Sequence, residues 1–263
     1  MRLDKFLAES SIGNRKMVRN YIKEGMVKVN GDVINEPAVE VNKDYDVIEY
    51  IDKVVCYTGK VYYMFHKPAG YITARTDEVN RTVFDFFNGI NMDGVFHVGR
   101  LDKDTEGLLL LTNDGEFEHQ LMFPEKHVEK TYFFWAFGSL NEEEKKSLEQ
   151  GIDIGQGSNE VFTKPAKIQV KRFGMYNELK GEMPIKNLYN IDSKKYEQPV
   201  VSGYLTISEG RKHQVKRMLK AVGCYIVYLK RISIGGLVLD ESLERGQHRP
   251  LTKAEVQKIL GPV

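Results

Sequence analysis

Three carboxylates lie close together in the segment from residue 99 to residue 107 of this 263-residue chain. They are Asp102, Asp104 and Glu106, and Leu108 to Leu111 follow at once. A run of four leucines predicts a strand that is buried on both faces. A loop at the end of such a strand is held rigidly, and binding and catalytic residues are often found there. The segment therefore predicts a site that uses carboxylate chemistry.

Three interpretations of this loop compete. The pattern Asp102-x-Asp104-x-Glu106 imitates the start of an EF-hand calcium loop. Its twelfth position, however, is Asn113 instead of a bidentate Glu, and leucines occupy positions that should bind the ion. A polar turn whose acids only cap backbone groups is the second interpretation. The third is a catalytic carboxylate that acts as a nucleophile or a base.

A basic segment lies further along the chain, between residues 211 and 231. It holds seven Lys or Arg and no Asp or Glu, and His213, Tyr225 and Tyr228 are interleaved with them. The whole chain carries 38 Lys and Arg against 37 Asp and Glu, so bulk charge attracts no particular partner. A local basic patch with aromatic residues predicts contact with nucleic acid.

Hydrophobic periodicity after residue 60 predicts strands that alternate with helices. The mixture favours an α+β domain with a mixed sheet. Residues 171–199 lack the hydrophobic pattern of a buried element, so we predict that they form a surface insertion. The predicted strands are 61–66, 71–74, 95–99, 107–112, 132–137, 161–170, 201–208 and 225–229, and the predicted helices are 83–87, 116–122, 142–149, 213–222 and 253–260.

The first sixty residues predict a separate unit of two helices and a hairpin. Apolar residues share one face of a helix near residues 3–7 and of a second helix near residues 15–23, which ends at Gly25. Asn30-Gly31 favours a tight hairpin turn. Residues 1–28 carry seven Lys or Arg against three acids, and residues 29–50 carry one Lys against six acids. Such a basic helix face either contacts RNA or is only solvated.

Composition excludes several classes of protein. Two cysteines cannot form a disulfide framework, the N-terminus lacks a signal-peptide core, and the longest apolar run, 221–229, is too short for a membrane span. We therefore expect a cytoplasmic protein with no membrane contact. There is no Walker loop and no complete Gly-x-Gly-x-x-Gly, and the six histidines lack ligand spacing, so we expect no metal and no cofactor.

The N-terminal motifs resemble the small RNA-binding module named after ribosomal protein S-four. The resemblance rests on Leu3-Asp4-Lys5-Phe6-Leu7, Asn14-Arg15 and the stretch Gly25 to Gly31. It implies that the two helices present basic residues, among them Arg15 and Arg19, to RNA phosphates. We expect this module and its linker to span residues 1–60, with a mobile tether near residues 51–60.

The remaining chain, 61–263, resembles the pseudouridine synthases of the RsuA class, which modify uridines in ribosomal RNA. The most specific match is Gly-Arg-Leu-Asp-x-x-Thr-Glu-Gly at 99–107. Further motifs of the family match in order along the chain. They are Lys67-Pro68-Ala69-Gly70, Lys130-Thr131-Tyr132, Glu209 to Met218, Leu229-Lys230-Arg231, Gly235-Gly236-Leu237 and Arg249 to Thr252.

The resemblance implies roles for individual residues. Asp102 would be the catalytic carboxylate, as nucleophile or as base at the sugar, whereas Asp104 and Glu106 would be structural. Lys216 would be its cationic partner. Tyr132 would stack on the extruded uracil and serve in proton transfer. The residues implied to contact the substrate are Arg100, Leu101, Arg211, His213, Gln214 and Leu229.

This family resemblance implies a catalytic domain with a central cleft. It also implies an isomerase that acts on ribosomal RNA or a pre-ribosomal particle, without a small-molecule cofactor and as a monomer. The segment 123–132 favours the enzymes of 16S rRNA over those of 23S rRNA. A non-catalytic ribosome-assembly protein that only binds RNA is the alternative from another class. A methyltransferase would need a glycine-rich loop near residue 65, and Lys67-Pro68-Ala69-Gly70 is not such a loop.

Overall fold

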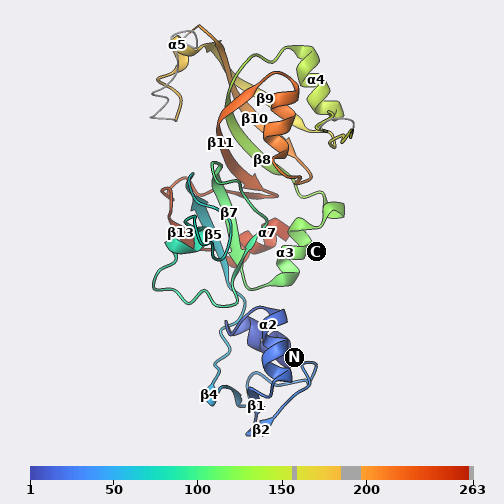
Figure 1. The fold of residues 1–263 in the computed structure, drawn as a ribbon, viewed down its shortest axis with the longest axis vertical. Coiled ribbons are helices and arrows are strands. Elements are labelled where there is room, and N and C mark those ends of the chain that lie inside the picture. The colour runs from blue at the N-terminus through green and yellow to red at the C-terminus, as the bar shows by residue number, and fades with distance from the viewer. Residues whose placement is uncertain (156–158, 185–196, 261–263) are drawn as a thin grey trace.

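The computed structural model describes residues 1–155, 159–184 and 197–260. Two sheets organise the chain, a four-stranded one near the N-terminus and a nine-stranded one in the larger domain. Figure 1 shows an elongated molecule with the N-terminal module at one end and the long strands β8 to β11 at the other. The α+β class with a mixed sheet, expected from the sequence, is confirmed.

The N-terminal module has the predicted helices and hairpin. Its apolar residues pack into one core, in which Leu3, Leu7, Val18 and Ile22 are fully buried. The Asn14 side chain caps the second helix by accepting a hydrogen bond from the Met17 amide. The elements are α1 (Leu3–Glu9), α2 (Arg15–Lys23), β1 (Val27–Val29), β2 (Asp32–Val33), β3 (Ile48–Tyr50) and β4 (Lys53–Val54), and the sheet order is β2-β1-β3-β4.

The hairpin turn between β1 and β2 has the geometry that its sequence predicts. Asn30 and Gly31 both adopt positive φ, +52° and +90°. The partner register Val29 with Asp32 leaves these two residues as the whole turn. This is the type I′ arrangement, which matches the twist of the two strands.

The expected tether near residues 51–60 is wrong for most of its length. Strand β4 pairs with β3, and Val55 is buried in the core of the module. The Tyr57 ring stacks on Phe6, with the ring centroids 5.5 Å apart. These apolar side chains bury surface against the module, so the segment belongs to its core.

A polar contact joins the module to the larger domain. The Asn113 side-chain amide donates hydrogen bonds to the backbone carbonyls of Glu9 and Gly59, at 3.3 and 2.9 Å. Its oxygen accepts a third hydrogen bond from the Val61 amide. The turn after β7 is therefore fastened both to α1 and to the connecting segment.

The large sheet is built from two antiparallel groups of strands that meet at one parallel pair. Its order is β13-β5-β7-β11-β8-β10-β9, with β6 beside β7 and β12 beside β11. The strands are β5 (Tyr62–Lys67), β6 (Phe96–Val98), β7 (Glu106–Thr112), β8 (Lys130–Phe137), β9 (Lys167–Met175), β10 (Pro199–Ile207), β11 (Tyr225–Ile234), β12 (Leu237–Val238) and β13 (His248–Pro250).

Helices cover this sheet. The structure has α3 (Gly115–Met122), α4 (Glu142–Gln150), α5 (Tyr176–Leu179), α6 (Gln214–Ala221) and α7 (Lys253–Leu260), with the 3-10 turns η1 (Val83–Phe86) and η2 (Pro124–Lys126). In Figure 1, α3 and α7 lie together on the half of the sheet that contains β5 and β7, and α4 lies beside the other half.

Strand β7 is the buried centre of the domain, as its leucines predict. Leu109 and Leu111 belong to the core on one face of the sheet, whereas Leu108 and Leu110 belong to the core on the other. β7 runs parallel to β11, with Gly107 opposite Arg231. Gly107 has a φ of +106°, and a Cβ there would overlap the Arg231 carbonyl oxygen. Only glycine allows this close approach of the two strands.

Two predicted strands differ from the observed structure. Residues 71–74 form only an isolated bridge, between Ile72 and Thr82. Residues 161–166 are not in the sheet, and β9 begins at Lys167. In both segments the alternating apolar residues pack beside the sheet instead of pairing within it. Ile72 lines the cavity described below, and Val161 packs against the main core.

The predicted insertion at 171–199 is wrong at its start. Residues 171–175 complete β9, and Tyr176 and Met183 are buried in a small core with Trp135 and Val200. Residues 185–196 lie outside the described residues, so the prediction is not tested there.

Strands β8 and β11 are longer than predicted, and each contains a buried cation outside its predicted bounds. β8 starts at Lys130, and β11 continues past Leu229 to Ile234. Lys130 and Arg231, at 6% and 2% exposure, are both buried. Charged residues are rarely fully buried, so a hydropathy pattern ends a strand before them.

None of the helices in residues 1–155, 159–184 and 197–260 is both long enough and apolar enough to cross a membrane.

Replacing Gly107 by Ala should destabilise the domain by about 2 kcal/mol or more, because the new Cβ meets backbone at a positive φ. Gly115→Ala is the matched control, since nothing lies within 4 Å of its Cβ position and helix α3 begins there. We expect the control to be neutral or stabilising by up to about 1 kcal/mol. Urea unfolding measures both, and equal stability of the two variants would contradict the close approach of β7 and β11.

Candidate active site

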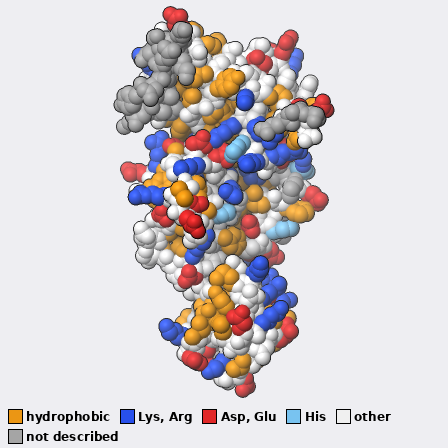
Figure 2. All heavy atoms as spheres, in the orientation of Figure 1, with side chains coloured by type: hydrophobic (Ala, Val, Ile, Leu, Met, Phe, Trp, Pro, Cys, Tyr) orange, Lys and Arg blue, Asp and Glu red, His pale blue; other side chains and the backbone are white. Residues whose placement is uncertain are grey.

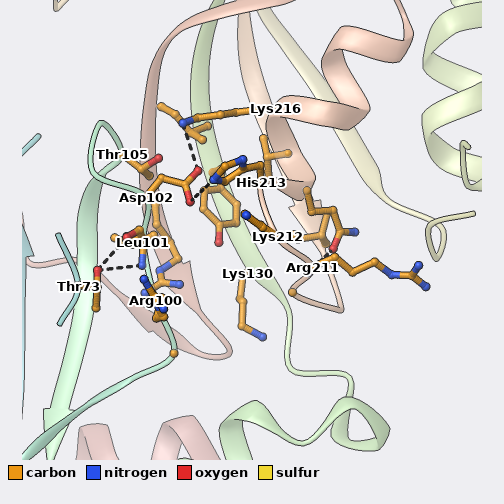
Figure 3. A pocket seen from close by; sticks show the side chains of 18 of the residues that line it. Thr73, Arg100, Leu101, Asp102, Thr105, Lys130, Arg211, Lys212, His213 and Lys216 are labelled. Atoms are coloured by element: carbon orange, nitrogen blue, oxygen red, sulfur yellow. Dashed lines mark hydrogen bonds and ion pairs between the residues drawn. The ribbon is translucent and has the colours of Figure 1, made fainter. Parts of the chain in front are cut away.

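A cavity of about 820 Å³ opens where the two halves of the large sheet meet. Its walls come from the loop before β7, from β8 and β11, and from the start of α6. Figure 3 shows Asp102 and Lys216 side by side in the upper part of this cavity, with Lys130 below them. The volume lies in the upper part of the range for ligand sites.

Asp102 and Lys216 form the ion pair that the sequence predicts. The Lys216 ammonium lies 3.1 Å from the Asp102 Oδ2 atom. The Lys216 side chain is 26% exposed and the Asp102 side chain is 29% exposed. Lys216 also contacts the Asp104 Oδ1 atom, at 2.5 Å. One ammonium therefore serves two carboxylates, on a wall of the cavity that solvent and a ligand can reach.

The neighbouring charges favour the ionised forms of Lys216 and Asp104. Burial opposes the charge of Lys216, but the hydrogen bonds that its ammonium donates to Asp104 and Asp102 outweigh burial and raise the pKa of the lysine above its usual value. Burial likewise opposes the charge of Asp104, yet the Lys216 ammonium holds the pKa of that carboxyl below its usual value. Lys216 and Asp104 therefore both carry charge at neutral pH.

His213 approaches the same carboxylate from the start of α6. Its Nε2 atom lies 3.6 Å from the Asp102 Oδ1 atom. His213 is the N-cap of the helix and has a left-handed φ of +53°. This backbone conformation turns the imidazole toward the loop that carries Asp102, as Figure 3 shows.

A buried lysine at the end of β5 holds the Asp102 loop in place. The Lys67 ammonium donates hydrogen bonds to the carbonyls of Asp102, Thr105 and Pro68 at 2.9–3.0 Å, and to that of Lys103 at 3.3 Å. The side chain is fully buried. Burial lowers the pKa of Lys67 to about 8, and the nearby carboxylates oppose that shift. The lysine therefore stays mainly charged at pH 7 and satisfies carbonyls that the tight loop leaves unpaired.

Two further contacts fasten the loop from the segment after β5. The Thr73 hydroxyl donates to the Leu101 carbonyl at 2.8 Å and accepts from the Leu101 amide at 3.1 Å. The Gly70 amide donates to the Lys103 carbonyl at 2.7 Å. Together with Lys67, these bonds fix the backbone on both sides of Asp102.

Glu106 points away from the cavity cluster. It accepts hydrogen bonds from the Tyr228 hydroxyl and from Arg245, at 3.0 and 2.9 Å. Its side chain is mostly buried. Glu106 therefore diverges from Asp102 and Asp104, which share Lys216. No metal-binding cluster of His, Cys, Asp and Glu occurs among the residues that the structure describes.

Tyr132 and Leu229 lie on the strands that form the base of the cavity. Both line it, and both are mostly buried, at 8% and 4% exposure. Tyr132 pairs with Arg231 across the sheet, and Leu229 pairs with Phe134. The register brings an aromatic and an apolar side chain to the same wall, as predicted.

The other predicted contact residues also line the cavity, but they differ in how far they are exposed and in whether other protein groups bind their side chains. Arg100 is exposed, whereas Leu101 is buried in the main core. Arg211 pairs with Glu209 at 3.0 Å and remains partly exposed. Gln214 is buried, and its amide bonds the Glu209 side chain and the Arg211 backbone, so it orders the loop before α6.

Arg15 and Arg19 lie in the N-terminal module, and neither lines the cavity. Both contact the buried Asp4 carboxylate, at 3.1 and 2.8 Å, and Arg2 joins them at 3.1 Å. Burial opposes the charge of Asp4, but the three guanidinium groups hold its pKa below the usual value. The side chains of Arg15 and Arg19 remain about half exposed. One buried acid therefore orients a basic surface on α2.

Three cavity or loop residues, Lys67, Thr73 and Lys130, received no role from the sequence, and Arg231 was included only in the basic segment at 211–231. Lys67, Lys130 and Arg231 stand in the quoted motifs, each as a charge within or beside an apolar stretch. A charge in such a place signals a buried contact, but the partner is a backbone carbonyl or a ligand, which a pattern of side chains does not reveal.

The arrangement offers a rigidly held carboxylate beside an ammonium, an aromatic ring on the adjoining wall and several cations at the rim. Such a cavity fits a reaction at a sugar carbon, in which a carboxylate attacks or removes a proton while a flat base rests against the ring.

Comparison with known proteins agrees with this geometry. Residues 61–221 match the RNA pseudouridylate synthase family, and residues 1–47 match the S4 domain. The chain is 38% identical to an uncharacterized RNA pseudouridine synthase of Bacillus subtilis (strain 168), over 100% of this chain and 99% of the relative.

Two named relatives and one solved structure are similarly close. The ribosomal small subunit pseudouridine synthase A of Haemophilus influenzae is 36% identical, over 99% of this chain and 100% of the relative. The ribosomal large subunit pseudouridine synthase B of Bacillus subtilis is 38% identical, over 98% and 95%. A crystal structure of a pseudouridylate synthase is 34% identical, with a TM-score of 0.61 and coverage of 98% and 99%. The chain therefore belongs to the RNA pseudouridylate synthase family and carries an S4 domain ahead of the synthase domain.

Proposed function

We propose that this protein isomerises a uridine of ribosomal RNA to pseudouridine, with 16S rRNA as the substrate. The observation that carries the proposal is the Asp102 carboxylate, paired with Lys216 inside a cavity and held on a loop that Lys67 fixes. RNA binding alone needs cations but has no use for an anion held in this way. The relatives' names support ribosomal RNA as the substrate.

The reaction moves one bond and conserves all atoms. The N1–C1′ bond of uridine breaks, the uracil turns, and C5 bonds to C1′ while the C5 proton leaves and N1 gains one. As a nucleophile, Asp102 would attack C1′, and the electrons of the broken bond would leave with the uracil. As a base, it would remove a proton from the sugar. In both routes Lys216 balances the carboxylate charge.

Tyr132 and Leu229 would hold the base during this rotation. The tyrosine ring offers a stacking surface, and its hydroxyl is a group that can carry a proton. Leu229 supplies an apolar wall that excludes water. Both side chains come from paired strands, so their positions are set by the sheet.

The substrate uridine must leave its stack to reach Asp102, which costs about a few kcal/mol. Cations around the cavity would offset this cost by contacting phosphates. Figure 2 shows Lys, Arg and His side chains gathered across the middle of the synthase domain. Arg100, Arg211, Lys212 and His213 line the cavity itself, and the basic side of α2 with Arg15 and Arg19 would hold a second part of the RNA.

A monomer in the cytoplasm that needs no cofactor is the form we propose, since isomerisation consumes neither redox equivalents nor phosphate energy. The alternative substrate is 23S rRNA, which the similarity to a large-subunit enzyme favours. The segment 123–132 remains the reason for choosing 16S rRNA.

Asp102→Asn should abolish isomerisation and leave RNA binding intact, because the side chain keeps its shape but loses its charge. Asp104→Asn is the matched control on the same ammonium, and we expect it to keep activity within about tenfold of the unmodified protein. Release of tritium from 5-tritiated uridine RNA measures the rate, and filter binding measures affinity. Substantial turnover by the Asp102→Asn variant would refute the proposed role.

Lys216→Met should lower the rate by about 10²-fold or more, because Asp102 and Asp104 then lie near each other without a cation. The pKa of Asp104 should rise from its lowered value in this variant, which NMR of the carboxyl carbons detects. Lys216→Arg retains the charge and should recover part of the rate. An unchanged rate in the Lys216→Met variant would contradict the proposal that catalysis needs the ion pair of Asp102 and Lys216.

Site-resolved mapping of pseudouridine in rRNA should show one position missing from cells that lack the gene. Loss of a 16S position supports the substrate proposed here, and loss of a 23S position favours the alternative. An unchanged map in both rRNAs would favour a non-catalytic ribosome-assembly protein that only binds RNA.

A further inference from the structure

Two buried cations at the base of the cavity have no acidic partner. Lys130 on β8 is 6% exposed and Arg231 on β11 is 2% exposed, and both line the cavity. Neither makes an ion pair with a carboxylate in the described part of the chain, where ion pairs extend to 4.0 Å. Buried charges normally have a partner of opposite charge, so the lack of such a partner for Lys130 and Arg231 needs an explanation.

The protein satisfies the two side chains only in part. The Lys130 ammonium donates to the Val128 carbonyl at 3.1 Å, and the Arg231 Nε donates to the Leu108 carbonyl at 2.7 Å. The Nη2 atom of Arg231 is shielded from solvent and has no hydrogen-bond partner. An ammonium carries three protons, so Lys130 retains donors for a ligand.

The charges of these side chains also act on each other. Burial lowers the pKa of Lys130 to about 8, and the positive charge of Arg231 adds to the shift. No carboxylate contributes in the opposite direction. Together these two charges give the base of the cavity a positive potential that favours an anion.

The position of Lys130 indicates which part of a nucleotide would meet it. Lys130 and Tyr132 are two residues apart on β8 and so project to the same face of the sheet. Figure 3 shows the Lys130 side chain directed away from Asp102. If the sugar meets Asp102 and the base meets Tyr132, the Lys130 ammonium is left for a group beyond them, and the remaining charged group of a nucleotide is phosphate.

We propose that Lys130, with Arg231 behind it, forms a phosphate-binding subsite for the nucleotide that enters the cavity. Lys130 makes the contact, and the shielded Arg231 strengthens it through its charge. The inference rests on the proposed function, since it takes a uridine nucleotide as the ligand. It assigns to the lysine of the Lys130-Thr131-Tyr132 motif a positioning role that is separate from the chemistry at Asp102.

The subsite has a characteristic pH dependence. Lys130 is charged below a pKa of about 8, so phosphate binding is present at pH 7 and is lost as the pH rises through 8. The other titratable and charged groups that line the same cavity are His97, Arg100, Asp102, Lys103, Glu118, Tyr132, Arg211, Lys212, His213, Lys216 and Arg231. Burial lowers the pKa of His97, so His97 is neutral throughout this range.

Uridine 3′,5′-bisphosphate and uridine, titrated into the full-length protein and followed by NMR, test the subsite. The bisphosphate should bind about tenfold more tightly than uridine at pH 7, and this preference should decline between pH 7 and 9. Lys130→Met should remove the preference. Lys130→Arg should keep it at pH 9, because arginine does not titrate there. Lys146→Met, on the exposed face of α4, is the control and should behave like the unmodified protein.

The arginine variant separates Lys130 from Lys67, whose pKa also lies near 8 and which Lys130→Arg leaves unchanged. A full preference in Lys130→Met would overturn the subsite, and so would a decline with pH in Lys130→Arg that equals that of the unmodified protein. If Lys130→Met does not fold, the pH profile of Lys130→Arg decides alone. These measurements detect no isomerisation, so their failure leaves the proposed function untouched, and that function stands or falls with Asp102→Asn.

Discussion

The buried ammonium of Lys67 is the interaction on which the geometry of the cavity depends. It gathers the carbonyls of Asp102, Lys103 and Thr105 into one cage and replaces the hydrogen bonds that a regular strand would provide. Burying such a charge is costly, and the hydrogen bonds to four carbonyls offset that cost. Because the carbonyls point inward to the lysine, the Asp102 side chain is directed outward, toward Lys216 and the cavity.

Much of the fold follows from local rules in the sequence. The leucines of β7, the Asn30-Gly31 turn and the helices α3, α4 and α7 each have a pattern or a cap that predicts them. The failures occur where an apolar pattern packs outside the sheet, as at residues 71–74, and where a strand carries buried charge, as at Lys130 and Arg231. Pairing partners and ligands decide these positions, and both are distant in the chain.

The ion pair of the cavity could be predicted because its members stand in two motifs, although they are 114 positions apart. The contacts around this ion pair could not be predicted from the motifs. Sharing of Lys216 between Asp102 and Asp104 depends on how α6 faces the loop, and the left-handed backbone of His213 sets that direction. Gln214 resembles a substrate contact in sequence, yet it serves the loop before α6.

The contacts of the Asn113 side chain make β7 a link between the cavity and the N-terminal module. One end of this seven-residue strand adjoins the loop of Asp102, and the other is fastened to the module through the carbonyls of Glu9 and Gly59. A strand of that length is about 23 Å long, and β7 is buried throughout, so it cannot bend or stretch. It holds the Asp102 loop at a fixed distance from the N-terminal module, so under the proposed function an RNA bound by the basic side of α2 would have to present its uridine at that distance.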